Sequence, residues 1–259
     1  MKDLPVICLT FDLEEFDLPL EYKQSIGQEQ QMNVTREGMN VLMPMLDQYK
    51  VHSTFFTTAN FAESNKDLIR NLSANHEIAS HSYFHSSFEN KDLDNSRKVL
   101  EEITGSRVTG FRMPRMQKVD HQQLLNAGYK YDSSLHPTWI PGRYNHFSKP
   151  ATIHKDGNLV IFPASVTPTL RSPLFWLSFK NFSISKYCGL VQKCLETYGY
   201  VNIYLHPWEF ADLDAYKLPR YIASKQPRMI HKLDNFLKHF SGKARFITIQ
   251  NFLKERNDL

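Results

Sequence analysis

The sequence predicts a single α/β domain built as a (β/α) barrel. Short β-prone runs alternate with helical patterns almost throughout, and the order strand, helix, glycine, strand recurs at least four times. This order is typical of parallel βα units rather than of a hairpin sandwich. The 259 residues suit one barrel of this kind, and no internal repeat, low-complexity tract or linker divides them. We therefore expect one domain over residues 1–259.

The first half of the chain alternates regularly between the two patterns. Runs of apolar and β-branched residues predict strands, and apolar residues at helical spacing predict helices. Gly105 and Gly128 directly follow helical patterns, where glycine favours the end of a helix. The expected elements are a strand at 5–12, a helix at 35–50, a strand at 51–59, a helix at 62–74, a strand at 76–82, a helix at 90–104, a strand at 108–114, a helix at 120–127 and a strand at 129–134.

The second half begins with a less regular stretch, 135–180, which is rich in proline, serine and aromatic residues. Because loops commonly carry specificity, we expect this stretch to shape a binding groove. Regular alternation then resumes, and Gly199 and Gly242 again follow helical patterns. The expected elements are a strand at 159–165, a helix at 185–198, a strand at 200–207, a helix at 227–240 and a closing run at 245–252.

Composition narrows the function and the location. The net charge is +4, but the charges are dispersed and no Lys/Arg run occurs, so nucleic acid is not an expected partner. The three cysteines, Cys8, Cys188 and Cys194, show no spacing typical of a disulfide framework or a zinc finger, which fits a reducing compartment. The N-terminus does not have the features of a signal peptide, and no stretch reaches the roughly 18 apolar residues of a spanning helix. We expect a cytoplasmic location.

Five charged or titratable residues stand at the carboxyl ends of predicted strands. They are Asp12 after VICLTF, His81 after EIAS, Arg112 after VTGF, Asp132 after YKY and His206 after VNIYL. In a (β/α) barrel these ends converge on one rim, and that rim carries the active site. Together the five residues predict a catalytic site, although each one alone is a weak signal.

Each residue also has a simpler interpretation. His81 and His85, four residues apart, can chelate a metal from one side of a helical turn, or they are two unrelated loop histidines. An aspartate after an apolar strand, such as Asp12 or Asp132, is also a common capping or turn residue. A histidine such as His206 can be a hydrogen-bonded core residue, and Arg112, close before a proline, can belong to a surface turn.

Motifs spread along the chain resemble those of the polysaccharide deacetylases of carbohydrate esterase family 4. Five motifs occur in the family's order: TFD at Thr10–Asp12, H-S-x-x-H at His81–His85, R-x-P at Arg112–Pro114, D-S-S at Asp132–Ser134 and L-H at Leu205–His206. The resemblance runs from about residue 5 to 252. The stretches EIASHSYFH, YKYDSS and YLHPWEF most resemble a bacterial subgroup tied to exopolysaccharide synthesis.

The resemblance implies a fold, a reaction and catalytic roles. The fold is a distorted (β/α) barrel, often with fewer than eight complete strand–helix pairs. The reaction is hydrolysis of an N-acetyl group on an amino sugar of a polysaccharide, an oligosaccharide or a lipid-linked precursor. Asp12 would be the base, paired with Arg112, and His206 the acid, paired with Asp132. A backbone N–H near Arg115 would help to bind the substrate oxyanion.

The resemblance also implies one divalent metal ion, usually zinc. Its ligands would be two histidines and one acidic residue: His81, His85 and Glu14. The acidic ligand departs from the common TFDD motif, because Leu13 stands where the second aspartate would be. Some relatives use D-x-D, and residues i and i+2 of a strand point the same way, which favours Glu14. A bend at the strand end would bring in Glu15 instead, and Asp12 itself is a further candidate.

Two other functions stay open at this stage. One is hydrolysis of a small cyclic amide or ureide by a barrel of the same superfamily. The other is carbohydrate binding by a pseudoenzyme that has lost its metal. The presence of both a base and an acid argues against the pseudoenzyme, because a binding module needs neither.

Aromatic residues near the expected rim suit a sugar, because aromatic rings stack on the faces of pyranoses. The candidates are Tyr83, Trp139, Phe175, Trp176 and Trp208, with Tyr83 and Trp208 preferred as substrate-binding residues. Ordinary packing is the alternative for each. The run PLFWLSFKNF (173–182) could instead lie against a membrane that carries a lipid-linked substrate.

Overall fold

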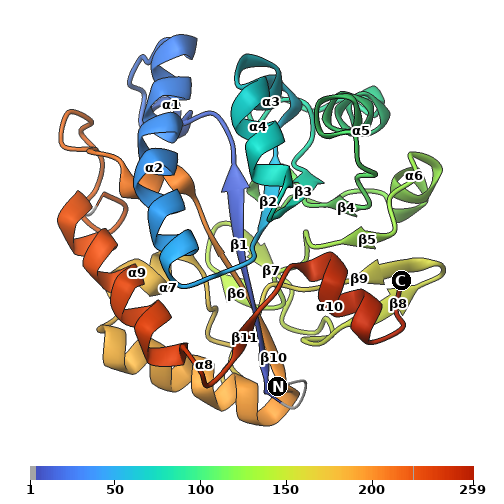
Figure 1. Ribbon diagram of the computed structural model, residues 1–259, viewed down its shortest axis with the longest axis vertical. Helices are drawn as coiled ribbons and strands as arrows, with labels where there is room; N and C mark the ends of the chain where they lie inside the picture. The colour runs from blue at the N-terminus through green and yellow to red at the C-terminus, as the bar shows by residue number, and fades with distance from the viewer. Residues whose placement is uncertain (1–3, 224) are drawn as a thin grey trace.

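Strand β1 (Val6–Leu13) is the centre of the fold, and all eight of its residues are buried. A computed structural model describes residues 4–223 and 225–259 (Figure 1). Strand β1 pairs in parallel with β10 (Tyr200–Leu205), β2 (Thr54–Thr57) and β11 (Arg245–Phe246). A strand covered on both faces reads as a continuous apolar run, which explains the sequence VICLTF.

Within the described residues, nine strands form one curled sheet in the order β10-β1-β2-β3-β4-β5-β9-β8, with β11 beside β1. Among the described strands of this sheet, β8 alone runs antiparallel to its neighbour. The remaining members of the sheet are β3 (Glu77–Ser80), β4 (Gly110–Phe111), β5 (Tyr131–Asp132), β8 (His154–Asp156) and β9 (Leu159–Ile161). A separate antiparallel pair is formed by β6 (Trp139–Ile140) and β7 (Tyr144–Asn145).

The sheet closes through the segment that follows β9. The backbone N–H of Ser165 donates to the carbonyl oxygen of Asn202 on β10 at 2.9 Å, and its Oγ accepts from the N–H of Asn202 at 2.8 Å. This contact joins the two ends of the sheet without a further regular strand. The predicted fold, a single distorted (β/α) barrel, is confirmed.

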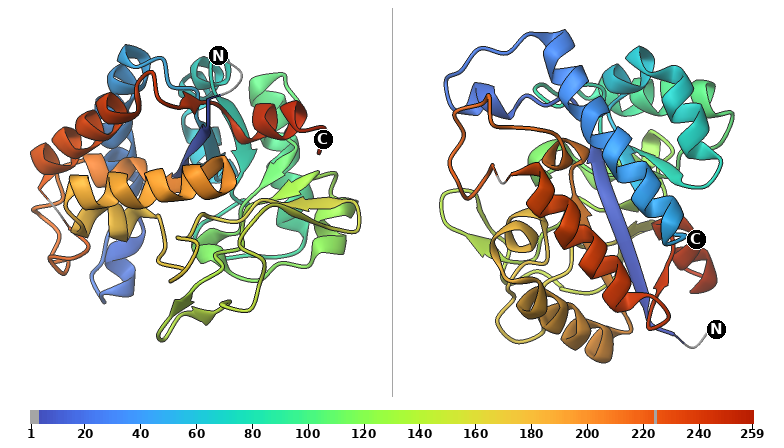
Figure 2. Two further views of the ribbon diagram at one scale, coloured as in Figure 1. Left: turned by 90° about the horizontal axis from the view of Figure 1, so that it is seen from below. Right: turned by 60° about the vertical axis from the view of Figure 1, so that its left-hand side comes forward.

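Helices lie around the outside of the sheet (Figures 1 and 2). They are α1 (Leu18–Glu21), α2 (Gln28–Gln48), α3 (Ala59–Ser64), α4 (Lys66–Ser73), α5 (Lys91–Thr104), α6 (His121–Asn126), α7 (Trp176–Asn181), α8 (Ile184–Tyr198), α9 (Gln226–Phe240) and α10 (Ile249–Glu255), with 3-10 turns η1 (Pro114–Met116) and η2 (Pro207–Phe210). As expected, Gly105 and Gly199 end α5 and α8 in the left-handed conformation. The helix expected at 62–74 is broken at Asn65, and the closing run 245–252 turns from strand into helix.

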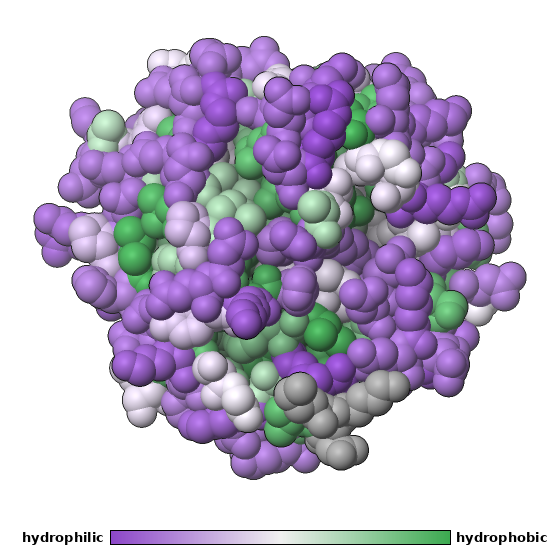
Figure 3. Space-filling model, viewed as in Figure 1, coloured by the Kyte–Doolittle hydropathy of each residue, from purple (hydrophilic) through white to green (hydrophobic). Residues whose placement is uncertain are grey.

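The apolar run 173–182 is part of the interior, so the expectation that it meets a membrane is wrong. Leu174 and Phe179 are 0% and 1% exposed, and Phe175 and Trp176 are 7% exposed. These side chains pack against the barrel and cannot also face lipid. The face in Figure 3 is largely hydrophilic, with apolar side chains visible in hollows. None of the described helices is long and apolar enough to cross a membrane.

Candidate metal centre and active site

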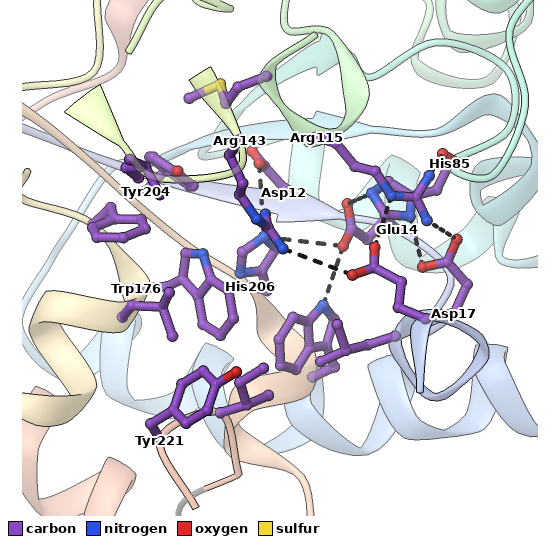
Figure 4. A pocket seen from close by; sticks show the side chains of 18 of the residues that line it. Asp12, Glu14, Asp17, His85, Arg115, Arg143, Trp176, Tyr204, His206 and Tyr221 are labelled. Carbon is purple, nitrogen blue, oxygen red and sulfur yellow. Dashed lines mark hydrogen bonds and ion pairs between the residues drawn. The ribbon is translucent and has the colours of Figure 1, made fainter. Parts of the chain in front are cut away.

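The registers of the parallel strands bring the predicted site residues together. Phe11 of β1 lies opposite Leu205 of β10, so the next residues, Asp12 and His206, are neighbours where these strands end. A pocket of about 360 Å³ opens beside them. Figure 4 shows His206 between two walls of this pocket, with Trp176 and Tyr221 on one side and Glu14, His85 and Asp17 on the other.

Asp12 is held by a fully buried arginine. One oxygen, Oδ1, accepts a hydrogen bond from Nη1 of Arg112 at 2.6 Å. The guanidinium also donates to Oγ1 of Thr10 at 3.0 Å and to Oγ of Ser133 at 3.0 Å. The second oxygen of Asp12 faces the histidines, 4.0 Å from Nε2 of His81 and 3.9 Å from Nε2 of His206. The arrangement leaves that oxygen available to a small molecule in the site.

Glu14 faces the two histidines of HSYFH. Its Oε2 lies 3.1 Å from Nε2 of His81 and 3.2 Å from Nε2 of His85. The neighbouring Glu15 turns the other way and accepts hydrogen bonds from Thr58 and Asn60. Of the acidic residues considered from the sequence, Glu14 alone has its carboxylate beside both histidines.

The histidine pair does not lie on a helical turn. The chain from His81 to His85 is irregular, and Ser82 has a positive φ of 67°. This kink brings the two rings to a centroid distance of 5.8 Å with an interplanar angle of 22°. The spacing predicted the right pairing, but a loop rather than a helix produces it.

Both histidines have their other ring nitrogen hydrogen-bonded to an oxygen. Nδ1 of His81 lies 2.8 Å from the carbonyl oxygen of Arg112, and Nδ1 of His85 lies 2.8 Å from Oδ1 of Asp17. A carbonyl or carboxylate oxygen only accepts, so each Nδ1 carries a hydrogen, and Nε2 is the ring nitrogen that faces Glu14 and is left for a metal. The three donor atoms lie within 4.8 Å of one another. Two imidazole nitrogens and one carboxylate oxygen are a donor set that fits zinc.

Charge balance at this cluster also favours a cation. Burial by itself would raise the pKa of Glu14, but the charge of His85 and the hydrogen bond to His81 lower it below its usual range. Burial by itself would lower the pKa of His85, but Glu14 and Asp17 outweigh it and raise that pKa to about 9. The carboxylates therefore draw positive charge into the site, which a divalent ion would supply in place of a proton.

His206 is fixed among aromatic rings. Its ring stacks on Trp208 at 4.7 Å between centroids and meets the edge of Trp176 at 5.4 Å. Its Nε2 lies 4.0 Å from Oε1 of Glu14, while its Nδ1 lies 3.1 Å from Oε1 of Glu209. The ring therefore presents Nε2 to the site and Nδ1 to the interior.

The expected pair between His206 and Asp132 is not formed, because Asp132 projects from the other face of β5. Successive residues of a strand point to opposite faces, and Ser133 points inward to Arg112. The Asp132 carboxylate instead accepts hydrogen bonds from Ser134 and lies 3.8 Å from Nε2 of His121. Asp132 lines a separate hollow beside α6.

Of the residues expected to bind substrate, Tyr83 is not among the described residues that line the pocket, and its hydroxyl donates to Glu63 at 2.7 Å. Arg115 does line it and donates to Asp17 at 2.9 Å. Trp208 lines it too, and its Nε1 lies 3.2 Å from Glu14.

Sequence reasoning missed two carboxylates of the site, Asp17 and Glu209. Asp17 belongs to the acidic stretch TFDLEEFDLP, but it reaches His85 only because the chain turns after β1 into α1. Glu209 follows His206 by three residues within HPWEF, and both lie at one short helical turn, η2. An acid three residues after a functional histidine at the start of such a turn is a signal that could have found it.

The fold and the polar cluster at its rim are those of a barrel hydrolase. The family model for polysaccharide deacetylase matches residues 2–131, which is just over half of the sequence. This chain belongs to the polysaccharide deacetylase family.

Solved structures show the same fold. A Mycobacterium smegmatis protein named as a polysaccharide deacetylase is 20% identical, with a TM-score of 0.66 and coverage of 96% of this chain and 89% of that one. A Pseudomonas aeruginosa PAO1 protein, also named as a polysaccharide deacetylase, is 15% identical, with a TM-score of 0.70 and coverage of 98% and 91%. Puue allantoinase is 14% identical, with a TM-score of 0.64 and coverage of 96% and 89%. Among curated proteins, no match was found.

Proposed function

We propose that this protein is a metal-dependent deacetylase that hydrolyses the N-acetyl group of an amino sugar in a saccharide and releases acetate. One observation carries the proposal. Three residues of the kind that bind a metal lie together, and two further residues flank them. These are Asp12, a buried carboxylate paired with an arginine, and His206, whose ring contacts a carboxylate. The metal would be zinc, held by Glu14, His81 and His85. The sequence resemblance further supports a role in exopolysaccharide synthesis.

The chemistry divides between these groups. A bound divalent ion supplies a Lewis acid that polarises the amide carbonyl and lowers the pKa of water. Asp12 takes the proton of the attacking water on the oxygen that Arg112 leaves free. His206 delivers a proton from Nε2 to the sugar nitrogen as its bond to the acetyl carbon breaks. Acetate and a free amine are the products. The backbone N–H of Arg115, in a left-handed turn after Pro114, is the proposed donor to the carbonyl oxygen.

The pocket walls suit a sugar ring. Trp176 and Tyr204 provide an apolar surface beside His206, and Arg115 and Arg143 provide hydrogen-bond donors on the rim. A sugar ring has an apolar face and polar edges, and so matches a site with both kinds of wall.

Acetate release is the direct test of this activity. The zinc-loaded protein would be incubated with chitopentaose, with partly acetylated poly-N-acetylglucosamine and with allantoin, and compared with Asp12→Asn. We expect acetate from an acetylated saccharide, and a loss of about 100-fold or more in Asp12→Asn, because the base is removed. Hydrolysis of allantoin without acetate release would instead support the cyclic ureide reaction.

Metal content, measured by elemental mass spectrometry, tests the ligand set. We expect about one zinc-like ion per chain in the wild type and in Asp12→Asn, and little in Glu14→Ala and His81→Ala, because three protein ligands hold a catalytic zinc. A wild-type protein that takes up no metal after reconstitution would contradict the proposal and favour a carbohydrate-binding protein.

A further inference from the structure

Glu209 is a buried carboxylate that contacts the proposed catalytic acid twice. It is 0% exposed. Its Oε1 accepts a hydrogen bond from the backbone N–H of His206 at 2.8 Å and lies 3.1 Å from Nδ1 of the same residue. One oxygen atom thus ties the ring of His206 to its own backbone, which fixes the side-chain torsions.

A buried lysine compensates the charge of Glu209. Nζ of Lys180, on α7, lies 3.4 Å from Oε2 of Glu209, and Lys180 is 2% exposed. The ammonium lies 5.2 Å from the ring centroid of Trp176 and 5.6 Å from that of Trp208, the two rings that pack on His206. It also donates to the carbonyl oxygen of Ile222. A carboxylate is kept charged in such an interior only with a partner of this kind.

We propose that Glu209, held in place by Lys180, is the positioning residue of His206, in the place where the sequence predicted Asp132. A carboxylate oxygen only accepts, so Nδ1 carries the hydrogen, and Nε2 must face Asp12 and the metal site. The inference deepens the proposed function and rests on it for the role of His206. The orientation of the His206 ring by Glu209 does not depend on which substrate the protein hydrolyses.

The key variant is Glu209→Gln, and Asp132→Asn is the matched control. In Glu209→Gln the ammonium of Lys180 attracts the amide oxygen, so the amide NH₂ turns toward His206. The NH₂ then faces two donors of His206, the backbone N–H and Nδ1–H, and the second clash is removed only if the ring hydrogen moves from Nδ1 to Nε2. Asp132→Asn makes an equally small change at a carboxylate that faces the other side of the sheet.

Kinetics separate positioning of an acid from general damage. On chitopentaose we expect kcat of Glu209→Gln to fall about 100-fold, because acid catalysis contributes about 10²–10⁴-fold, with KM nearly unchanged. On 4-nitrophenyl acetate we expect almost no change, since a phenolate leaves without a proton. Asp132→Asn should keep the wild-type kcat on both probes. Equal losses on both probes in Glu209→Gln, or a larger loss on chitopentaose in Asp132→Asn, would overturn the proposal.

A spectroscopic measurement gives an answer even if no amide probe is hydrolysed. Two-dimensional spectra of ¹⁵N-histidine-labelled, metal-free protein report which ring nitrogen carries the hydrogen in the neutral ring, with His206 assigned from His206→Gln. We expect the Nδ1–H form in the wild type and in Asp132→Asn, and the Nε2–H form in Glu209→Gln. An unchanged ring in Glu209→Gln, with a folded chain by thermal unfolding, would refute the role of Glu209. A wild type that releases no acetate refutes only the proposed function.

Discussion

Asp12 and Arg112 form a buried ion pair across the barrel, with Oδ1 of the carboxylate 2.6 Å from Nη1 of the guanidinium. Arg112 is 0% exposed and Asp12 is 4% exposed. The guanidinium also lies 3.9 Å from the ring centroid of Phe56 on the adjacent strand β2. The pair therefore links separate strands of the barrel. It also holds the carboxylate of the proposed base in position.

Removal of the arginine should cost stability as well as activity. In Arg112→Met the bulk is largely kept, but Asp12 loses its partner in a place with little water. We expect a loss of about 3–5 kcal/mol in the free energy of unfolding, the range for one half of a buried pair. Urea denaturation followed by circular dichroism measures it.

The control is an ion pair on the surface. Nη1 of Arg70 lies 2.8 Å from Oδ1 of Asp67 on α4, and both side chains are more than half exposed. Arg70→Met should change the free energy of unfolding by less than about 1 kcal/mol, because water replaces the lost partner. If Arg112→Met and Arg70→Met lower the free energy of unfolding by similar amounts, the buried Asp12–Arg112 pair contributes no more to stability than a surface pair.

Asp17 should govern metal affinity through His85. Its Oδ1 lies 2.8 Å from Nδ1 of His85 and its Oδ2 lies 2.9 Å from Nη2 of Arg115. In Asp17→Asn, Arg115 attracts the amide oxygen and the NH₂ faces His85, which disfavours the ring form that binds a metal. We expect zinc affinity to fall about 10–100-fold, as is typical when a support of a ligating histidine is lost.

Competition with a chromogenic chelator measures this affinity, and Glu21→Gln is the control. Glu21 accepts from Nε of Arg115 at 2.9 Å without touching His85. Its replacement should leave zinc affinity at the wild-type value. The role of Asp17 would be excluded by wild-type affinity in Asp17→Asn, or by an equal loss in Glu21→Gln.

Much of the site could be predicted because parallel strands place their carboxyl ends at one rim. Asp12, His81, Arg112 and His206 lie at the carboxyl ends of four such strands, and the structure brings all four into one cluster. The ends of parallel strands can be located from the sequence pattern without knowing side-chain positions. Apolar runs followed by polar residues are therefore enough to predict the cluster.

Side-chain direction was harder to predict. Strand β5 has only two residues, Tyr131 and Asp132, and so gives no alternation from which its inward face could be recognised. The direction is set by Arg112, which binds Ser133 from inside the barrel. The partner of a charged side chain also depends on the tertiary fold. Lys180 can pair with Glu209 only because α7 packs next to the turn that carries Glu209.

Hydrophobicity alone could not distinguish a buried segment from a docking surface. The run 173–182 has the composition of either one. Phe175 and Trp176 are buried because the barrel brings them against Tyr204 and His206, which lie far along the chain. Such long-range contacts are not encoded in local periodicity.

His76 should make the fold sensitive to acid. Burial is the main cause that lowers its pKa to about 4, and the nearby His52 adds to the effect. The unfolded chain, with a histidine pKa near 6.5, binds this proton more readily, so stability is full above about pH 6.5 and is lost as pH falls toward 4. The slope would be at most about 1.4 kcal/mol per pH unit.

His76→Asn should flatten this part of the stability–pH curve. Nδ1 of His76 accepts from the backbone N–H of Ser53 at 3.2 Å, and the Asn oxygen can take that place without titrating. Urea midpoints between pH 4 and 7 give the comparison, with His231→Asn on the exposed side of α9 as control. If His76→Asn keeps the wild-type slope, other groups cause the acid sensitivity.

Gly38 lets helix α2 pack directly on the turn that follows His206. A Cβ placed at Gly38 would lie 1.9 Å from the carbonyl oxygen of Pro207, in η2. Gly38→Ala must push this turn away, and with it Trp208 and Glu209. We expect a loss of about 1–3 kcal/mol in the free energy of unfolding, the usual cost of overpacking, together with a lower kcat for acetate release.

Gly189 provides the opposite case within another helix, α8. A Cβ there would meet nothing within 4 Å, so Gly189→Ala adds a better helix former without a clash. We expect a gain of about 0.5–1 kcal/mol in the free energy of unfolding and an unchanged kcat. Urea denaturation and acetate release measured on Gly38→Ala and Gly189→Ala side by side would decide the point. If both variants are equally stabilised, α2 does not press on the catalytic turn. If the free energy of unfolding falls in Gly38→Ala and rises in Gly189→Ala, the position of His206 depends on the packing of a helix outside the pocket.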